Sequence, residues 1–252
     1  MLKVVSFKAS GEFAAFRDPS VTSNQTVYYI PSKTSVVGMV GAILGIERGH
    51  GVEENYGLPY RQLYGKIRIG IECEAIPEKV SFFTNHRSLK EPKTKPFKTE
   101  LVFRPKYRIF VSSDDGIVKK VYDAVSSANY VYPPYLGHAY CPATLSDAAM
   151  YEAKEIGDTT FHTSCTVLDE SETFNKTFEL EARPYDANEP HKNNSLLIER
   201  HLHHFMLDGK LEGRVLKHWI PVAGSQFKFT MSEYPRLSLI IRLDNDKIVC
   251  LY

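Results

Sequence analysis

The chain has 252 residues, a formal net charge of +1 and 12% aromatic residues, which excludes an intrinsically disordered protein. Its length is enough to bury a core, either as one domain or as one domain with a smaller second one. No run approaches about 18 apolar residues, no charged-then-apolar segment opens the chain and the 4 cysteines lack C-x-x-C spacing, so we expect a soluble cytoplasmic protein with free thiols and no membrane partner.

The first elements in chain order are a strand, a helix and a second strand. Residues 2–7 form an apolar run typical of a strand. Residues 34–47 are predicted to form a helix with Ser32 or Thr34 as its N-cap. Residues 66–76 alternate apolar and polar positions with period two, which indicates a second strand.

The middle of the chain predicts further strands and a second helix. Residues 80–83 should return beside the preceding strand, and the basic, proline-containing residues 86–98 favour a loop or a projecting hairpin tip. Residues 101–111 are predicted to be a strand, and residues 114–129 a helix with one of its first two aspartates near the start. This order is typical of a ferredoxin-like, RNA-recognition-motif-like α+β fold, whose sheet leaves one face open for RNA.

After two consecutive prolines the pattern changes to short strands with acidic turns. We place a soft boundary at residues 130–145. This divides the chain into a ferredoxin-like RNA-binding domain, residues 1–140, and a smaller, mostly-β C-terminal region, residues 141–252. The apolar runs on either side of residues 244–247 predict a terminal hairpin.

Three glycines lie on one face of the first predicted helix. Gly38, Gly41 and Gly45 are spaced at i, i+3 and i+7, and each costs about 1 kcal/mol relative to alanine in a helix interior. We expect a close approach of the helix to offset this cost. Its own sheet is the favoured neighbour, and a partner or a nucleic-acid backbone is the alternative.

The charges are polarised along the chain. Residues 87–108 carry eight basic and two acidic side chains, a net charge of +6, whereas residues 147–189 carry eleven acidic and three basic ones, a net charge of −8. The basic stretch interleaves with Phe97, Phe103 and Tyr107. Basic groups attract phosphates and aromatic rings stack on bases, so this pattern favours single-stranded nucleic acid; a solvated loop is the alternative.

A second candidate site opens the first helix. Lys33, Thr34 and Ser35 stand where unpaired N–H groups and the helix dipole favour a phosphate. A plain helix cap is the alternative. Nearby, Arg17 offers a planar donor fork, and one of the adjacent tyrosines Tyr28 and Tyr29 should face the core while the other is free to stack on a base.

Several motifs follow one another in chain order: GEFA at 11–14, FR at 16–17, YIP at 29–31, KT at 33–34, Gly38, GAILG at 41–45, RPKYRIFV at 104–111 and PYLG at 134–137. Together they resemble motifs of the Cas-five family, the CRISPR-associated subunits of type I Cascade complexes, and they are most similar to the type I-B branch.

The resemblance implies a RAMP-type domain with a projecting β-hairpin thumb pressed against the guide RNA. It implies a non-catalytic subunit, without cofactor, that binds the 5-prime handle of CRISPR RNA in antiviral defence. The implied partners are CRISPR RNA, the Cascade backbone subunit and large subunit, and target DNA through the complex. The expected RNA-binding residues are Arg17, Tyr28, Tyr29, Lys33, Thr34, Ser35, His86, Arg87, Lys93, Lys95, Lys98, Arg104, Lys106, Tyr107, Arg108 and His138.

A metal-independent endoribonuclease that processes precursor CRISPR RNA is the first alternative. Such an enzyme needs a general base, a general acid and a cation, often His, Tyr and Lys. The type I-C branch of the family uses such a set, but no complete set can be assigned to this sequence. An RNA-binding or scaffolding module outside CRISPR systems is the remaining alternative.

A short histidine run suggests a metal site at first sight. On a strand, His201 and His203 would share a face, but no Cys or acidic residue follows at a conventional ligand interval. We therefore expect no metal here, and histidines that are solvent-exposed or at the edge of the core.

Overall fold

The structure is a computed structural model that describes residues 1–21, 24–49, 58–87, 93–171, 179–184, 195–207 and 210–252. Among these residues the helices are α1 (Lys33–Leu44), α2 (Leu58–Lys66) and α3 (Asp115–Ser126). The strands are β1 (Leu2–Ser10), β2 (Phe13–Ala14), β3 (Arg68–Cys73), β4 (Glu78–Arg87), β5 (Thr94–Phe103), β6 (Lys106–Ser112), β7 (Thr144–Glu155), β8 (Thr160–Thr163), β9 (Val167–Asp169), β10 (Leu180–Pro184), β11 (Ser195–Leu207), β12 (Lys210–Val222), β13 (Phe227–Met231), β14 (Leu239–Leu243) and β15 (Ile248–Leu251).

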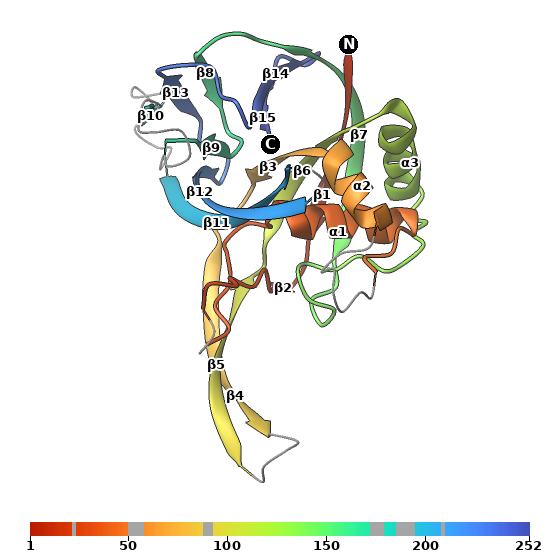
Figure 1. Ribbon diagram of the computed structural model, residues 1–252, viewed down its shortest axis with the longest axis vertical. Helices are drawn as coiled ribbons and strands as arrows, with labels where there is room; N and C mark the ends of the chain where they lie inside the picture. Colours follow the sequence, from red (N-terminus) through yellow and green to blue (C-terminus); the bar gives the residue numbers. More distant parts are fainter. Residues whose placement is uncertain (22–23, 50–57, 88–92, 172–178, 185–194, 208–209) are drawn as a thin grey trace.

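A nine-stranded sheet forms the centre of the molecule, in the order β11-β12-β3-β6-β1-β7-β14-β15, with β9 paired to β12 (Figure 1). Strand β1 lies antiparallel between β6 and β7, and β6 lies antiparallel between β1 and β3. Two smaller sheets have the orders β10-β13-β8 and β2-β5-β4. The architecture is mixed α+β and mostly sheet. The expected division at residue 140 stays a prediction, and β7, which follows it, pairs with β1.

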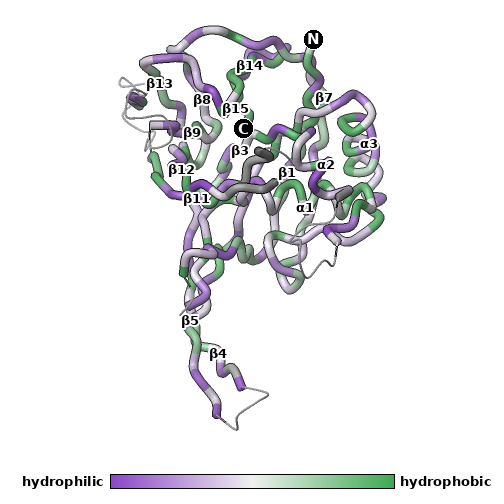
Figure 2. Tube along the Cα trace, in the orientation of Figure 1, coloured by the Kyte–Doolittle hydropathy of each residue, from purple (hydrophilic) through white to green (hydrophobic). Residues whose placement is uncertain are grey.

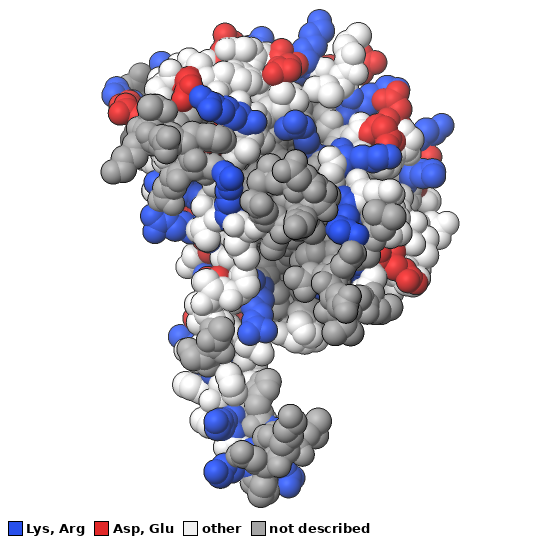
Figure 3. All heavy atoms as spheres, viewed as in Figure 1, with Lys and Arg blue, Asp and Glu red and all other residues white. Residues whose placement is uncertain are grey.

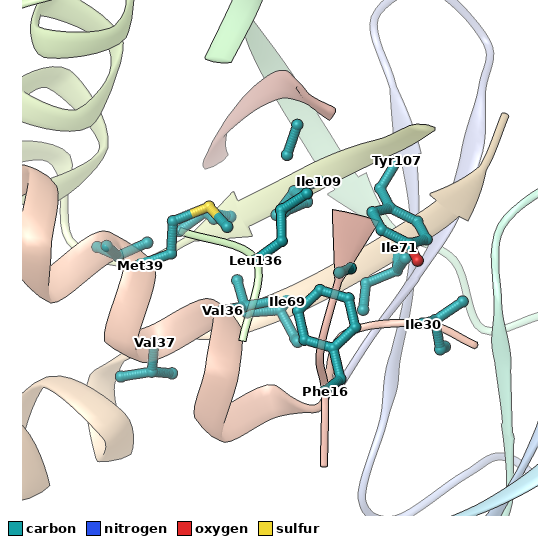
Figure 4. Packing of buried hydrophobic residues seen from close by; sticks show 14 of the residues in the cluster. Phe16, Ile30, Val36, Val37, Met39, Ile69, Ile71, Tyr107, Ile109 and Leu136 are labelled. Atoms are coloured by element: carbon teal, nitrogen blue, oxygen red, sulfur yellow. The ribbon is translucent and has the colours of Figure 1, made fainter. Parts of the chain in front are cut away.

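The three helices cover one face of the central strands. Figure 4 shows Met39 and Val36 of α1 packed with Ile109 of β6 and Ile69 of β3. Alternate residues of these strands point to this face because a strand has a side-chain period of two. This main core therefore lies between α1, α2, α3 and the sheet, and it fixes the segments that leave β1 and enter α1.

The opposite face of the sheet is not the open RNA-recognition surface that the fold pattern suggested. Val4 of β1 and Phe110 of β6 are buried there against Ile241 of β14 and Val249 of β15. Backbone hydrogen bonds in both directions between Ile69 and Tyr252 bring the end of β15 onto β3. The C-terminal strands thus cover part of the face that would otherwise present aromatic side chains to RNA.

Strands β4 and β5 form a hairpin that is inserted between β3 and β6 and projects from the body of the molecule (Figure 1). Their antiparallel pairing runs from Glu78 opposite Phe103 to Arg87 opposite Thr94. Strand β2 pairs with β5 at the root of this hairpin. Figure 2 colours several residues along the hairpin as hydrophilic.

Most of the expected elements are present, with shifted ends. Ser32 is the N-cap of α1, which begins at Lys33 rather than residue 34 and ends at Leu44. The N-cap of α3 is Asp114. The expected strand over 101–111 is wrong, because Arg104 adopts a positive φ of 44° and separates β5 from β6. Helix α2 was not predicted, and its last residue is Lys66, so β3 is shorter than the expected strand.

The three glycines of α1 do not share one close contact with the sheet. A Cβ at Gly41 would lie 3.0 Å from the Ile46 carbonyl oxygen, and Gly45 is the left-handed C-cap with φ 74°. A Cβ at Gly38 would meet no atom within 4 Å. The expectation that the glycine face packs tightly on the sheet is therefore wrong, because the atoms nearest to Gly41 and Gly45 belong to Ile46 and Val131, outside the strands, and Gly38 has none within 4 Å.

Candidate functional site

A cleft lies at the root of the β4–β5 hairpin, and we call it the hairpin-root cleft. It has a volume of about 460 Å³. Three segments that are distant in the sequence line it: the segment after β2, the two hairpin strands and the loop before β7. The lining side chains include Arg17, Gln25, Phe82, Thr84, Thr99, Glu100, His138 and Tyr140.

Backbone hydrogen bonds hold the first wall of the cleft against the hairpin. The Gln25 N–H donates to the Lys98 carbonyl at 2.9 Å, and the Glu100 N–H donates to the Gln25 carbonyl at 2.8 Å. Arg17 forms an isolated bridge with Val27. The loop after Arg17 is therefore joined to β5, and the Arg17 side chain is exposed beside the cleft.

A tight loop that contains Gly137 and precedes β7 forms another wall of the cleft. The Ala15 N–H donates to the Leu136 carbonyl at 2.9 Å, and this bond holds the loop against the segment that follows β2. Gly137 has φ 87°, and a Cβ there would lie 2.3 Å from the Ala15 carbonyl oxygen. Only glycine fits this contact. As a result, His138 and Tyr140 line the same cleft as Arg17.

The side chains of the cleft combine aromatic faces with a cation. The rings of His138 and Tyr140 stack with centroids 4.0 Å apart, and Tyr140 is 54% exposed. Phe82 contributes a further partly exposed ring from β4. A guanidinium suits phosphate, and exposed rings suit stacking on bases. The arrangement is chemically suited to a single-stranded nucleic acid.

The two adjacent tyrosines have the different surroundings that the sequence suggested. Tyr28 is buried, its hydroxyl donates to Asp18 at 3.1 Å, and its ring stacks on His201 at 4.0 Å between centroids. Burial raises the pKa of Tyr28. Tyr29 is half-buried, and the Lys79 ammonium lies 3.9 Å from its ring centroid. Of the two rings, Tyr29 is the one near the surface.

Glu199 of β11 fixes the backbone of this tyrosine pair. The Tyr29 N–H donates to both oxygens of Glu199, at 3.0 and 2.9 Å, and the Lys79 ammonium lies 3.7 Å from the same carboxylate. Burial raises the pKa of Glu199 to about 7, while Lys79 and the Tyr29 N–H act in the opposite direction. The C-terminal half of the chain thereby positions a segment near the hairpin root.

His201 and His203 of β11 are buried, so the expectation of exposed or core-edge histidines is wrong for these two. His201 Nε2 lies 2.7 Å from Glu199 Oε2, and His203 Nε2 lies 2.9 Å from Nε2 of His218 on β12. Burial lowers the pKa of His201 to about 3 and that of His218 well below its ordinary value. In the part of the chain that the structure describes, no group of three or more His, Cys, Asp or Glu side chains is arranged to hold a metal ion.

The start of α1 is capped by its own side chains. The Ser32 hydroxyl accepts from the Ser35 N–H at 3.3 Å and lies 2.9 Å from the Thr34 hydroxyl. The Lys33 ammonium lies 5.1 Å from the centroid of the Tyr64 ring. Burial lowers the pKa of Lys33 to about 8, with a smaller effect from a nearby arginine. Phosphate binding by this helix start stays a prediction.

The expected basic stretch does not form one surface. Tyr107 is buried and its hydroxyl donates to the Tyr29 carbonyl, while Arg108 pairs with Glu74 at 3.0 Å. Arg104 lies in the bend between β5 and β6, 3.4 Å from a carboxylate oxygen of Glu12, and Lys106 is exposed on β6.

The basic residues of the hairpin form a separate group. Arg87, Lys93 and Lys95 are exposed, and Lys98 lies 3.3 Å from a carboxylate oxygen of Glu100. Figure 3 shows basic side chains gathered towards the far end of the hairpin. His86 lies on β4, but its side chain is outside the described residues.

The sequence gives little indication that two further side chains, Tyr140 and Phe83, belong near the site. Tyr140 follows His138 by two residues, but nothing local marks it as part of a cleft. Phe83 is 75% exposed and stands opposite Lys98 in the hairpin register. An exposed ring beside a cation in a basic strand pair is the pattern that points to it.

The fold and the cleft define an α+β protein, mostly sheet, with basic and aromatic side chains on and beside a projecting hairpin. The sequence profile of the family described as CRISPR-associated protein (Cas_Cas5) matches residues 4–209, and the chain belongs to this family. None of the curated proteins matches the sequence. Among the described residues no helix is long and apolar enough to cross a membrane.

Solved structures share the fold at low identity. A CRISPR protein from Archaeoglobus fulgidus aligns with a TM-score of 0.56 and 13% identity, covering 99% of both chains. A chain of a CRISPR RNA-guided surveillance complex aligns with a TM-score of 0.51 and 11% identity, covering 88% of this chain and 91% of that one. A further match, to a crystal structure of a Cas protein, covers only 59% of that chain, with a TM-score of 0.38 and 16% identity.

Proposed function

We propose that this chain is a non-catalytic subunit of a type I-B Cascade complex that binds the 5-prime handle of CRISPR RNA in antiviral defence. The hairpin-root cleft is the observation that carries the proposal. It combines an exposed guanidinium with stacked rings, and exposed basic side chains continue from it along the hairpin. Membership of a CRISPR-associated family supports the same function.

The proposed core is ferredoxin-like and RAMP-type. The order β3-β6-β1-β7, with all neighbours antiparallel and helices after β1 and β6, supports it. The β4–β5 hairpin is the proposed thumb, and all elements described after α3 are strands. The proposed partners are CRISPR RNA, the backbone subunit and the large subunit, with target DNA contacted through the complex and no cofactor.

The distribution of candidate acids and bases supports a binding role. Tyr28 and Tyr107 are buried, and their hydroxyls donate to groups of the chain itself. Lys106 stands beyond the turn on β6, away from the residues that line the cleft. Among the described side chains, Tyr28, Tyr107 and Lys106 are therefore not brought together in the cleft as the acid, base and cation of a ribonuclease would be, which supports the binding role.

One observation favours the alternative of a metal-independent endoribonuclease. The cleft brings His138, Tyr140 and Arg17 together, and these residue types can serve as base, acid and cation. The rings of His138 and Tyr140 stack on each other with centroids 4.0 Å apart, an arrangement that favours stacking on a base.

A cleavage assay separates the two functions. Purified chain incubated with end-labelled CRISPR repeat RNA, without metal, should retain the RNA on a filter and leave it at full length. Specific cleavage that disappears in His138→Ala would contradict the binding role and establish the ribonuclease. In vivo, sequencing the ends of the RNA that co-purifies with the chain tests the handle assignment.

A further inference from the structure

Gly38 stands in the middle of α1, where glycine is unfavourable relative to alanine. It has an ordinary helical φ, and a Cβ there would meet no atom within 4 Å. Neither backbone strain nor close packing therefore accounts for the missing side chain. Gly38 is exposed, and the space above it belongs to a pocket.

This pocket, which we call the α1 pocket, has a volume of about 140 Å³. Its floor is one face of α1, formed by Thr34, Gly38 and Ala42, and Tyr135 and Arg48 are among the residues around it. Pockets for drug-sized ligands usually measure about 300–1,000 Å³. The α1 pocket is therefore of a size for one small planar group.

The chemistry of the pocket suits a ring with polar edges. Tyr135 is 46% exposed and offers an aromatic face, Ala42 and Gly38 leave a small apolar floor, and Arg48 and hydroxyl groups provide polar atoms at the rim. The helix start itself is satisfied by Ser32, so a phosphate on the helix dipole is not the ligand that this site favours.

The pocket adjoins the hairpin-root cleft through one loop. Tyr135 and Gly137 line the α1 pocket, and His138 and Tyr140 line the cleft. Tyr135 and His138 are three residues apart, which limits their Cα atoms to a separation of about 11 Å. Between them, Leu136 points into the core beside Met39, so the loop is anchored to α1 (Figure 4).

We propose that the α1 pocket takes a single nucleobase, unstacked from a single-stranded RNA that runs through the hairpin-root cleft. The inference rests on the proposed RNA-binding function and adds a base-binding site to it. Gly38 leaves open the volume that the base fills, and Tyr135 stacks on its face. The bound base contributes through stacking and shape, and so adds no phosphate contact.

The chain offers a matched control for a pocket-filling substitution. Gly65 lies in α2, is also exposed, and would also place a Cβ in open space, but it does not line the pocket. Gly38→Leu fills the α1 pocket, whereas Gly65→Leu makes the same chemical change elsewhere. Both replace a glycine within a helix, Gly38 in the middle of α1 and Gly65 in the last turn of α2, so both should fold at least as stably as the wild-type chain.

The test measures the affinity of the full chain for fluorescein-labelled 12-nucleotide oligouridine and oligoadenosine at several salt concentrations. Gly38→Leu should weaken binding at least threefold to at least one of the two RNAs, with an unchanged salt slope because no charge is altered. Gly65→Leu should bind like wild type. Tyr135→Ala should weaken binding to the same RNA without filling the pocket, which keeps the test informative if Gly38→Leu folds poorly.

The outcomes distinguish the inference from the proposed function. If wild type binds RNA, and Gly38→Leu and Tyr135→Ala bind both RNAs within threefold of Gly65→Leu, the base pocket is wrong and the RNA-binding function stands. A changed salt slope in Gly38→Leu would also overturn the base pocket, because it would show altered phosphate binding. If wild type binds neither RNA, the proposed function and this inference both fail.

Discussion

Tyr28 and Tyr29 are neighbours in the sequence, but their side chains should contribute to different properties. Tyr28 is buried against His201, so Tyr28→Ala should lower the free energy of unfolding by about 3 kcal/mol or more. Tyr29 lies near the surface under Lys79, so Tyr29→Ala should cost about 1–3 kcal/mol of RNA affinity. Urea unfolding and fluorescence anisotropy on both variants check this. Equal losses of stability in both, with RNA affinity kept, would make this segment purely structural.

Because His201 is buried, the free energy of unfolding should fall as the pH is lowered. Burial lowers the pKa of His201 to about 3, whereas an unfolded histidine titrates near 6.5. Between these values the unfolded chain binds a proton that the folded chain does not, so this histidine's contribution is complete above about pH 6.5 and is lost as pH falls. The loss is about 1.4 kcal/mol per pH unit.

The variant His201→Gln tests this sign, because glutamine keeps a donor for Glu199 and does not titrate. Its free energy of unfolding should fall less steeply between pH 6 and pH 5 than that of wild type. Glu199, whose pKa is raised to about 7, titrates in the opposite sense, and the buried His218 is present in both chains, so the difference between the two slopes reports the loss of His201 together with its effect on these two neighbours. Identical slopes would contradict a neutral, buried His201.

At the scale of elements, the hairpin carries the predicted phosphate-binding side chains. Arg87 and Lys95 are exposed on β4 and β5, so Arg87→Glu with Lys95→Glu should weaken RNA binding and reduce the salt slope by about 0.7 for each phosphate that is no longer neutralised. Lys119→Glu with Lys120→Glu makes the same charge change on the exposed face of α3 and is the control. Equal effects of the two pairs would show that the hairpin acts only through net charge.

Elements with strong local signals were predictable, whereas those fixed by tertiary contacts were not. Asp114 and the periodic apolar residues marked α3, and Ser32 marked α1. Helix α2 contains a glycine and is short. Tyr60 and Leu63 of this helix are buried in the main core, so packing rather than propensity stabilises it. The break at Arg104 was hidden because a positive φ is uncommon for residues other than glycine.

Individual residues of the candidate site could be selected from the sequence, but their grouping in one cleft could not be predicted. Arg17 and His138 were chosen from separate motifs, and only the docking of the Gly137 loop on Ala15 brings them into one cleft. Tyr107 was assigned to RNA from its basic neighbours. Strand alternation instead turns its ring into the core.

At the scale of the whole molecule, the C-terminal strands complete the N-terminal core rather than standing apart from it. Strands β14 and β15 cover part of the sheet, and Glu199 of β11 holds the Tyr29 backbone. This coverage removes part of the sheet face from contact with RNA. It leaves the hairpin, its root cleft and the loop before β7 as the surface where exposed rings and cations meet.

The most direct test of this account is ultraviolet cross-linking of the purified chain to a single-stranded CRISPR repeat RNA, with the cross-linked peptides mapped by mass spectrometry. The account predicts cross-links in three segments, residues 13–30, residues 79–101 and residues 132–141, and their disappearance in excess unlabelled RNA. Specific cross-links confined to α3 and the β7–β14 side of the sheet, with none in these three segments, would contradict it.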